Sequence, residues 1–401
     1  MNKNLLLPLA IAAAVFVGIG VWLSGQEAPV TAAQSGGPLI EGLADRVNDI
    51  TAVTVTDGDE QVTLEREGGV WHVAERDGYR ADLSQLRRRL VALVEAKRLE
   101  GKTTNPERYA QLGVSDVSEG DDDDQNLKVA VAGPEGFDLI VGKRANASQG
   151  TYVRFADEAQ SWLASGDLRF SANARDWLKK DLLDIPANRV RSASLAHSSG
   201  DRIELSKARP EDPNYGLDNL PDDREVLSPS AGNSIASAIA GLRFEDVAPA
   251  SQENFQGLEI VQGEYETFDG LRVSTRAFNR EDKYYVMLDV AFDAELAAQS
   301  KPEPSAPAAD AEESDGEAAD TEAGEAGSFE DTQAAQAAAD AAAMAAYEES
   351  VAAAEAEAEA LKPLTDGWVF EIPSYKHGNL TKSLEDLLKP LDDGSDADDA
   401  E

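Results

Sequence analysis

The fold is decided by residues 50–73, which read ITAVTVTDGDEQVTLEREGGVWHV. Apolar and polar side chains alternate over residues 50–55 and again over residues 62–64, as half-buried β-strands require. A Gly68-Gly69 turn then leads into a third apolar stretch at residues 70–73. These segments predict three antiparallel strands joined as a meander.

A helix is predicted directly after the meander. Asp82 followed by Gln85 has the pattern of a helix N-cap. Apolar side chains then recur with helical spacing at Leu83, Leu86, Leu90, Leu93 and Val94. Further strands are predicted at residues 127–131, 137–141 and 152–155 and around Trp162. Antiparallel strands mixed with packed helices predict an α+β fold.

The same order of segments recurs later in the chain, which predicts an internal duplication. Residues 190–195 alternate like residues 50–55, about 140 positions on, and Leu90 matches Ile235 at an offset of about 145. Later strands of the second copy are expected at residues 203–205, 271–275, 284–290 and 368–372. Each copy is expected to close on a helix with the triplet Asp-Leu-Leu, at residues 181–183 and 386–388.

The offset between the copies rises to about 205 across a low-complexity acidic insert at residues 297–361. Its part from Pro302 to Ser328 is rich in Pro, Gly, Ser and acids and is predicted to be disordered. Its part from Asp331 to Leu361 has the Ala and Glu content of a solvated helix, with disorder as the alternative. Deletion of residues 302–360 is expected to leave the body folded. The predicted repeats are therefore residues 39–185 and 186–391, followed by an acidic tail at residues 392–401.

Charge and composition limit the functions that the chain can have. The 401 residues carry a formal net charge of -40, of which 28 lie in the acidic stretches 116–124, 301–360 and 392–401. Such a charge opposes nucleic-acid binding, because Lys and Arg supply affinity for phosphate. The chain has no Cys, which excludes disulfides, thiolate nucleophiles and Cys-ligated metals.

The N-terminus carries a predicted membrane anchor. The uncharged run from Leu5 to Leu23 is long enough to span a bilayer core of about 30 Å as a helix. Lys3 precedes it, so residues 1–4 are expected in the cytoplasm, and the body should follow a linker at residues 24–38 on the outer side. This predicts a single-pass protein of a bacterial inner membrane with a periplasmic body. A signal peptide cleaved near Ala33 is the alternative.

No candidate catalytic, cofactor-binding or metal-binding residues emerge from the motifs. His72, His197 and His377 lie in separate stretches and are interpreted as structural, although spacing alone leaves a catalytic triad open. Residues 121–124 are four consecutive Asp without the spacing of a calcium loop, and a solvated loop is favoured over a cation site. Arg87-Arg88-Arg89 is interpreted as a solvated helix face or as a contact for an acidic partner. Core packing is preferred over a sugar-binding platform for Trp71, Trp162, Trp177 and Trp368.

Several of these segments resemble a known family. Residues 106–114 read PERYAQLGV and are followed by Gly142, by Tyr152-Val153-Arg154 and finally by residues 368–373, WVFEIP. From about Leu39 to Leu391, outside the insert, the chain resembles the bacterial "domain of unknown function 4340" family. The resemblance implies a membrane-anchored envelope protein, often encoded beside an ABC exporter and its gliding-motility-type auxiliary subunit. It implies no catalytic residues and no cofactor.

The leading hypothesis is a non-enzymatic accessory or scaffold protein of an envelope complex, with the membrane and ABC transporter subunits as partners. A periplasmic module that binds glycans or peptides is one alternative, and it requires a cleft lined by aromatic side chains. A hydrolase with an unrecognised site is the other, and it requires a histidine that meets an acid and a nucleophile.

Overall fold

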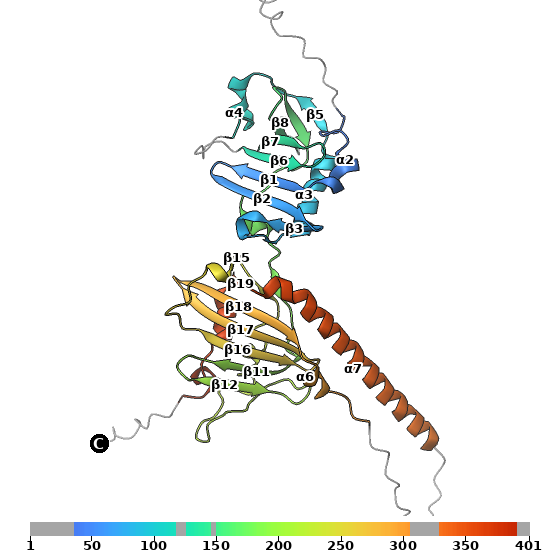
Figure 1. Cartoon of the computed structure of the whole chain (residues 1–401), viewed down its shortest axis with the longest axis vertical. Helices are drawn as coiled ribbons and strands as arrows, with labels where there is room; N and C mark the ends of the chain where they lie inside the picture. Colours follow the sequence, from blue (N-terminus) through green and yellow to red (C-terminus); the bar gives the residue numbers. More distant parts are fainter. Residues whose placement is uncertain (1–35, 118–125, 146–149, 305–328, 391–401) are drawn as a thin grey trace, which may run out of the picture. The chain divides into compact units, whose positions relative to one another are not determined.

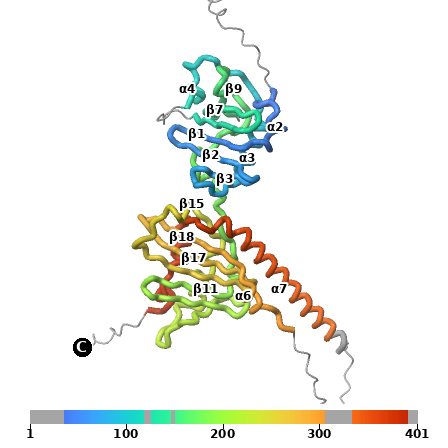
Figure 2. Tube along the Cα trace, viewed as in Figure 1, coloured from blue at the N-terminus to red at the C-terminus, as the bar shows by residue number. Residues whose placement is uncertain are grey.

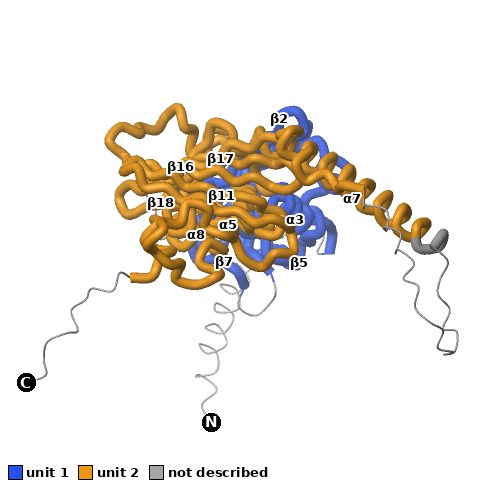
Figure 3. Tube along the Cα trace, turned by 90° about the horizontal axis from the view of Figure 1, so that it is seen from below, with its two compact units in different colours: residues 1–72, 83–176 blue, residues 73–82, 177–401 orange. Residues whose placement is uncertain are grey.

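The computed structural model describes residues 36–117, 126–145, 150–304 and 329–390 (Figure 1, Figure 2). The chain divides into two compact units (Figure 3). Unit 1 takes its described residues from 1–72 and 83–176, and unit 2 takes them from 73–82 and 177–401. Both units contain antiparallel sheets and helices, which confirms the α+β fold class.

Unit 1 is built around one antiparallel sheet with the strand order β3-β2-β1-β6-β7-β8-β9-β5. The strands are β1 (Ala52–Asp57), β2 (Glu60–Glu67), β3 (Val70–Val73), β5 (Arg98–Gly101), β6 (Leu127–Ala132), β7 (Phe137–Arg144), β8 (Gly150–Phe155) and β9 (Ser161–Ser165). The helices are α2 (Leu43–Arg46), α3 (Leu83–Glu95) and α4 (Tyr109–Leu112), with 3₁₀ turns η2 (Val47–Asp49), η4 (Pro106–Arg108) and η5 (Ala174–Trp177).

The core of unit 1 follows the predicted periodicities. Val53 and Val55 of β1 lie opposite Leu64 and Val62 of β2, and all four side chains are fully buried. On α3 the buried side chains are Leu86, Leu90 and Leu93, which are members of the predicted apolar stripe. The meander and its helix are therefore confirmed.

Unit 2 contains a second antiparallel sheet with the order β13-β12-β11-β16-β17-β18-β19-β15, and a strand pair β10-β14. Its sheet strands are β11 (Val190–Ala196), β12 (Arg202–Ser206), β13 (Gly216–Leu217), β15 (Asp246–Pro249), β16 (Val261–Thr267), β17 (Leu271–Arg280), β18 (Lys283–Phe292) and β19 (Trp368–Glu371). The short strands are β4 (Tyr79–Arg80), β10 (Asp181–Leu183) and β14 (Leu242–Arg243). The helices are α5 (Asn233–Ala236), α6 (Ala294–Ala298), α7 (Phe329–Thr365) and α8 (Ser374–Leu380), with 3₁₀ turns η3 (Ala74–Arg76), η6 (Ala250–Gln252) and η7 (Glu385–Leu387).

Two local predictions for unit 2 need correction. The predicted closing helix at Asp181–Leu183 is wrong, because these residues form β10 and pair with β14. The second triplet, at residues 386–388, lies in and just after the 3₁₀ turn η7 rather than in an α-helix. Strand β16 was not predicted at all. Its buried positions alternate, but one of them is Gly263, which weakens the apolar signal.

The acidic insert contributes one long helix. Residues 329–365 form α7, which confirms helix as the state of the Ala and Glu segment. The helix packs against β17 and β18 (Figure 1), and Ala354 and Ala358 are its buried alanines. Because alanine methyl groups are small, the helix backbone can approach the sheet closely. The predicted disordered part, residues 302–328, lies mostly outside the described residues.

The insert can be shortened to a defined point. Pro302 and Ser350 line the same groove, so a short Gly-Ser linker from residue 304 to residue 351 should close the gap. We expect a change in the free energy of unfolding below about 1 kcal/mol, since loop-closure entropy depends weakly on length. The tolerated deletion should not extend to residue 360, because Ala354 and Ala358 are buried and Glu357 pairs with Arg189 at 2.8 Å. The stabilities of the shorter deletion, residues 305–350, and of the longer deletion, residues 302–360, can be compared by urea denaturation. Equal stabilities would contradict this limit.

Unit 2 also contains a segment from the first half of the sequence, residues 73–82. Its Tyr79 ring is buried and meets the rings of Phe244, Trp368 and Phe370 edge-on, with centroids 5.5, 5.0 and 5.9 Å away. Arg76 Nε donates to Asp246 Oδ1 at 2.5 Å. The sequence does not predict that residues 73–82 belong to unit 2, because the contacts that hold them there join residues far apart in the sequence.

Among the described residues, no helix has both the length and the apolar character needed to cross a bilayer. The predicted anchor, Leu5 to Leu23, lies outside those residues, and so do the linker up to residue 35, residues 121–124 and the tail after Pro390.

Candidate functional site

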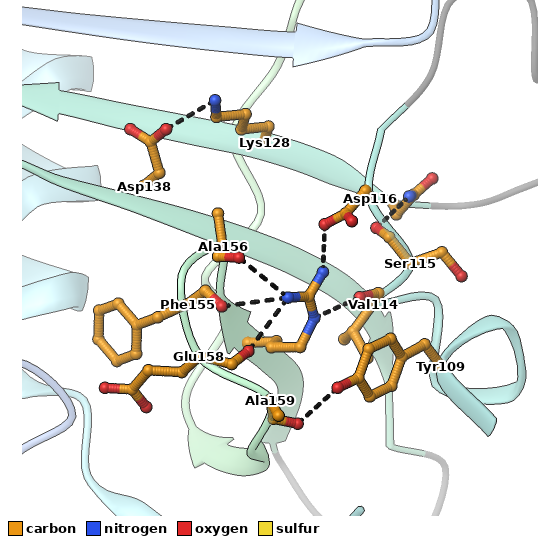
Figure 4. A network of polar contacts seen from close by, with 12 residues as sticks. Tyr109, Val114, Ser115, Asp116, Lys128, Asp138, Phe155, Ala156, Glu158 and Ala159 are labelled. Carbon is orange, nitrogen blue, oxygen red and sulfur yellow. Dashed lines mark hydrogen bonds and ion pairs between the residues drawn. The ribbon is translucent and has the colours of Figure 1, made fainter. Parts of the chain in front are cut away.

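A buried arginine organises the segments that carry the family resemblance in unit 1 (Figure 4). Arg154 of β8 is only 4% exposed. Its Nε donates to the carbonyl oxygen of Val114 at 3.0 Å, and its Nη2 binds the Asp116 carboxylate. Its Nη1 donates to the carbonyl oxygens of Phe155, Ala156 and Glu158 at 3.3, 3.3 and 3.1 Å. A guanidinium group suits this role because its donors form a rigid fork.

Tyr109 of α4 forms a second contact with the same arginine. The Arg154 guanidinium lies 4.6 Å from the centre of the Tyr109 ring, within the range of a cation–π interaction. The Tyr109 hydroxyl donates to the carbonyl oxygen of Ala159 at 2.6 Å. Arg154 and Tyr109 therefore hold the turn after α4 against the loop between β8 and β9 (Figure 4).

Gly142 of β7 completes this arrangement. A Cβ atom at this position would lie under 3.0 Å from the carbonyl oxygens of Leu112 and Gly113. Close by, Tyr109, Val114 and Ile140 form a buried apolar cluster. The structure thus brings together residues 106–114, Gly142 and Arg154, which are far apart in sequence. Their shared role is to hold the backbone of the turn after α4 close to β7 and to the loop between β8 and β9.

The three histidines occupy ordinary structural positions. His72 is half-buried in β3. His197 donates from Nε2 to the carbonyl oxygen of Lys382 at 2.8 Å. His377 of α8 is buried, and its ring lies 4.9 Å from the ring of Tyr284. His377 Nε2 has no hydrogen-bond partner among the described residues. These surroundings favour the structural interpretation.

Burial gives His377 a pH signature. Desolvation lowers the pKa of His377, opposed by a hydrogen bond to the backbone of Phe278. The folded state therefore binds a proton less readily than the unfolded state does. The contribution of neutral His377 to stability should be complete above about pH 6.5, the ordinary histidine pKa, and should decline as the pH falls below it. The difference in urea midpoint between pH 7.5 and pH 5.5 should be smaller in His377→Gln than in the wild type. Equal differences would contradict the assignment.

Two buried lysines were missed by the sequence analysis. Lys376 of α8 donates to the carbonyl oxygens of Ala238 and Ala240. Lys207, just after β12, donates to the carbonyl oxygen of Pro210 at 3.1 Å and lies 5.0 Å from the centre of the Tyr215 ring. Burial lowers the pKa of both amines. Nothing in the sequence distinguishes them from solvated lysines, because their acceptors are backbone carbonyls and a ring face.

A groove in unit 2 has a volume of about 620 Å³. Its walls include Phe268 and, from α7, Tyr347. Arg189, Arg191 and Arg209 also line it. Arg189 forms ion pairs with Asp269 and Glu357, and Arg191 donates to the Gln299 side chain at 2.8 Å. The groove combines aromatic rings with guanidinium groups, which can contact polar ligands.

The tryptophans lie mainly in the cores. Trp71, Trp162 and Trp177 are at most 7% exposed, which confirms core packing for these three, and Trp368 is half-buried against Tyr79. Within the described residues no group of three or more His, Asp or Glu side chains could hold a metal ion.

The comparisons with known proteins agree with the motifs. The family model described as "Domain of unknown function (DUF4340)" matches residues 71–259, from β3 to the loop before β16. The match includes Arg154 and its neighbours but is shorter than the region from Leu39 to Leu391 that the sequence predicted. No curated protein and no solved structure matched the chain. The chain resembles the family of domains of unknown function 4340 over residues 71–259, and residues 106–114, Gly142 and Arg154 in that range meet at the packing site.

Proposed function

We propose that this protein is a non-enzymatic accessory or scaffold subunit of a bacterial envelope complex, anchored by Leu5 to Leu23 with its body in the periplasm. The observation that carries the proposal is the role of the residues in the segments that resemble the family. Arg154 and Tyr109 donate to backbone carbonyl oxygens (Figure 4). Gly142 allows the close approach of the backbone at Leu112 and Gly113. A chain in which these residues build a rigid body suits a protein that positions neighbours. The resemblance directs those neighbours toward ABC transporter subunits.

We also propose that the two sheets arose by duplication, so that the scaffold has two related platforms. The strand order β3-β2-β1-β6-β7-β8-β9-β5 of unit 1 matches the order β13-β12-β11-β16-β17-β18-β19-β15 of unit 2 strand for strand. In addition, unit 1 has an isolated β-bridge between Pro38 and Lys97, and the corresponding place in unit 2 is taken by the pairing of β10 with β14. An identical order of eight strands supports a common origin, because many other orders are compatible with antiparallel sheets.

The ends of the proposed copies match through three pairs of backbone contacts inside unit 2. Ala81 bridges to Leu178 as Val226 bridges to Leu388. The Asp82 amide donates to the carbonyl oxygen of Trp177, and the corresponding Leu227 amide donates to that of Leu387. In the third pair, the Lys179 amide donates to the carbonyl oxygen of Arg80, and the Lys389 amide donates to that of Glu225. The partner of Asp386-Leu387-Leu388 is therefore Asp176-Trp177-Leu178, five residues before the predicted triplet. Residues 181–183 then begin the second copy.

The groove beside α7 favours one alternative, a module that binds glycans or peptides. Phe268 and Tyr347 supply the aromatic walls that the alternative requires, and Arg191 and Arg209 supply donors. Titration of the protein with oligosaccharides and acidic peptides, with Tyr347→Ala as the control, would distinguish this function from a scaffold.

The scaffold is tested by its associations in the host. Affinity purification of the tagged full chain in mild detergent should recover transporter permease or auxiliary subunits. Recovery should fall when a cleavable signal replaces residues 5–23, because membrane confinement raises the effective concentration of neighbours. Replacement of His72, His197 and His377 by Gln should leave function in the host intact. Loss of function in a folded triple variant would favour a hydrolase and overturn the scaffold.

A further inference from the structure

Helix α3 presents three arginines that the fold does not use. Arg87 and Arg88 are exposed and Arg89 is half-buried. No ion pair or hydrogen bond to these three guanidinium groups is found among the described residues, although ion pairs to arginine recur elsewhere in both units. In a chain with a net charge of -40, these three arginines without carboxylate partners make the surroundings of α3 locally positive, with Arg87 and Arg88 exposed.

Apolar side chains share this surface. Leu83 is 46% exposed and Val91 is 44% exposed. Together with Arg87 they are spaced four residues apart, so the three side chains lie along one side of the helix. The other side carries the buried Leu86, Leu90 and Leu93. We call Leu83, Arg87, Arg88 and Val91 the basic stripe, and Arg89 lies on another flank of the helix. Exposed apolar side chains beside arginines can contact the boundary between lipid head groups and acyl chains.

The chain enters unit 1 directly beside the end of α3. The amide of Gly36 donates to the carbonyl oxygen of Arg98, and the amide of Leu39 donates to that of Ala96, both at 2.7 Å. Residues 96–98 follow α3 immediately. Only residues 24–35 separate this point from the predicted anchor, and 12 residues reach at most about 40 Å. A membrane that holds the anchor is therefore within reach of α3.

We propose that the basic stripe of α3 docks onto anionic phospholipid head groups of the membrane that holds the anchor. This inference rests on the proposed anchor. Guanidinium groups bind phosphate oxygens in bidentate geometry, while Leu83 and Val91 can enter the interface between head groups and acyl chains. Charges more than about 8 Å apart are largely screened at physiological salt, so the local arginines outweigh the acidic total of the chain. The contact fixes the orientation of unit 1 over the membrane.

The absence of cysteine allows a direct test in the full-length protein. A Val91→Cys variant carries a single nitroxide label on the stripe, and Val70→Cys, with a side chain 38% exposed in β3, is the matched control. Both proteins are reconstituted into vesicles of phosphatidylcholine alone or of phosphatidylcholine with about 30% phosphatidylglycerol as the anionic lipid. We expect the label at residue 91 to become more accessible to oxygen and less accessible to a polar nickel complex in the anionic vesicles. The label at residue 70 should not change. Substitution of Arg87, Arg88 and Arg89 by Gln should abolish the effect.

The outcomes separate this inference from the proposed anchor. Failure of the full chain to float with pure phosphatidylcholine vesicles would overturn the anchor and the inference with it. Flotation with an identical signal from residue 91 in both vesicle types would overturn the docking alone. A signal that persists in the triple Gln variant, or one that arises only when an acidic peptide is added, would also overturn it. Matching urea midpoints of the labelled variants and the wild type would show that the label leaves the fold intact.

Discussion

Replacement of Arg154 by methionine should lower the free energy of unfolding of unit 1 by about 3–5 kcal/mol, because several carbonyl oxygens lose their donor at a cost of roughly 1–3 kcal/mol for each buried one. Methionine fills much of the space but donates no hydrogen bonds. The carbonyl oxygens of Val114 and Phe155, two buried residues, would then lose their charged donor. Hydrogen exchange in urea, followed at residues 109–116, should show the loss of protection.

A matched control separates the network from the charge. Arg144 forms an exposed ion pair with Asp167 at 3.5 Å, and the two side chains are 67% and 40% exposed. Arg144→Met should therefore cost less than about 1 kcal/mol. Arg154→Lys keeps the charge but loses the fork, so it should be almost as damaging as Arg154→Met. Equal costs for Arg144→Met and Arg154→Met would refute the structural role assigned to Arg154.

The strands and the main helix were predictable because their signals are periodic. Residues 50–55 and 190–195 alternate with period two, and α3 carries an apolar stripe, so local sequence and tertiary burial agree at these places. The triplet at residues 181–183 gave no such signal. Three residues contain less than one helical turn, and strand and helix cannot be distinguished over that length. Its pairing with β14 is decided by tertiary structure.

The packing site was predictable only in part. Sequence identified residues 106–114, Gly142 and Tyr152-Val153-Arg154 as characteristic, but it could not show that they meet. Arg154 donates mostly to backbone carbonyls, which every residue possesses, so its partners leave no trace in side-chain identity. The same reason hides Lys376, whose acceptors are two carbonyl oxygens. Buried cations that bind backbone are therefore poorly visible from sequence.

Substitution of Gly142 by alanine should destabilise unit 1 by about 3 kcal/mol, near the upper end of the usual cost of overpacking. The added methyl group would meet the carbonyl oxygens of Leu112 and Gly113. These are backbone atoms in the turn that Arg154 and Tyr109 hold in place, so they cannot move away as a flexible side chain could. The clash should therefore separate α4 from β7. Hydrogen exchange should report this as lost protection in both elements.

Gly378 provides the opposite case in the same protein. It lies within α8, and a Cβ atom there would meet no heavy atom within 4 Å. Gly378→Ala should therefore raise the stability of unit 2 by up to about 1 kcal/mol, since alanine favours helix more than glycine does. Replacement of glycine by alanine should therefore lower the stability at Gly142 of β7 and raise it at Gly378 of α8. A Gly142→Ala variant as stable as the wild type would show that the turn after α4 tolerates displacement, and the rigid packing site that supports the scaffold would lose its basis.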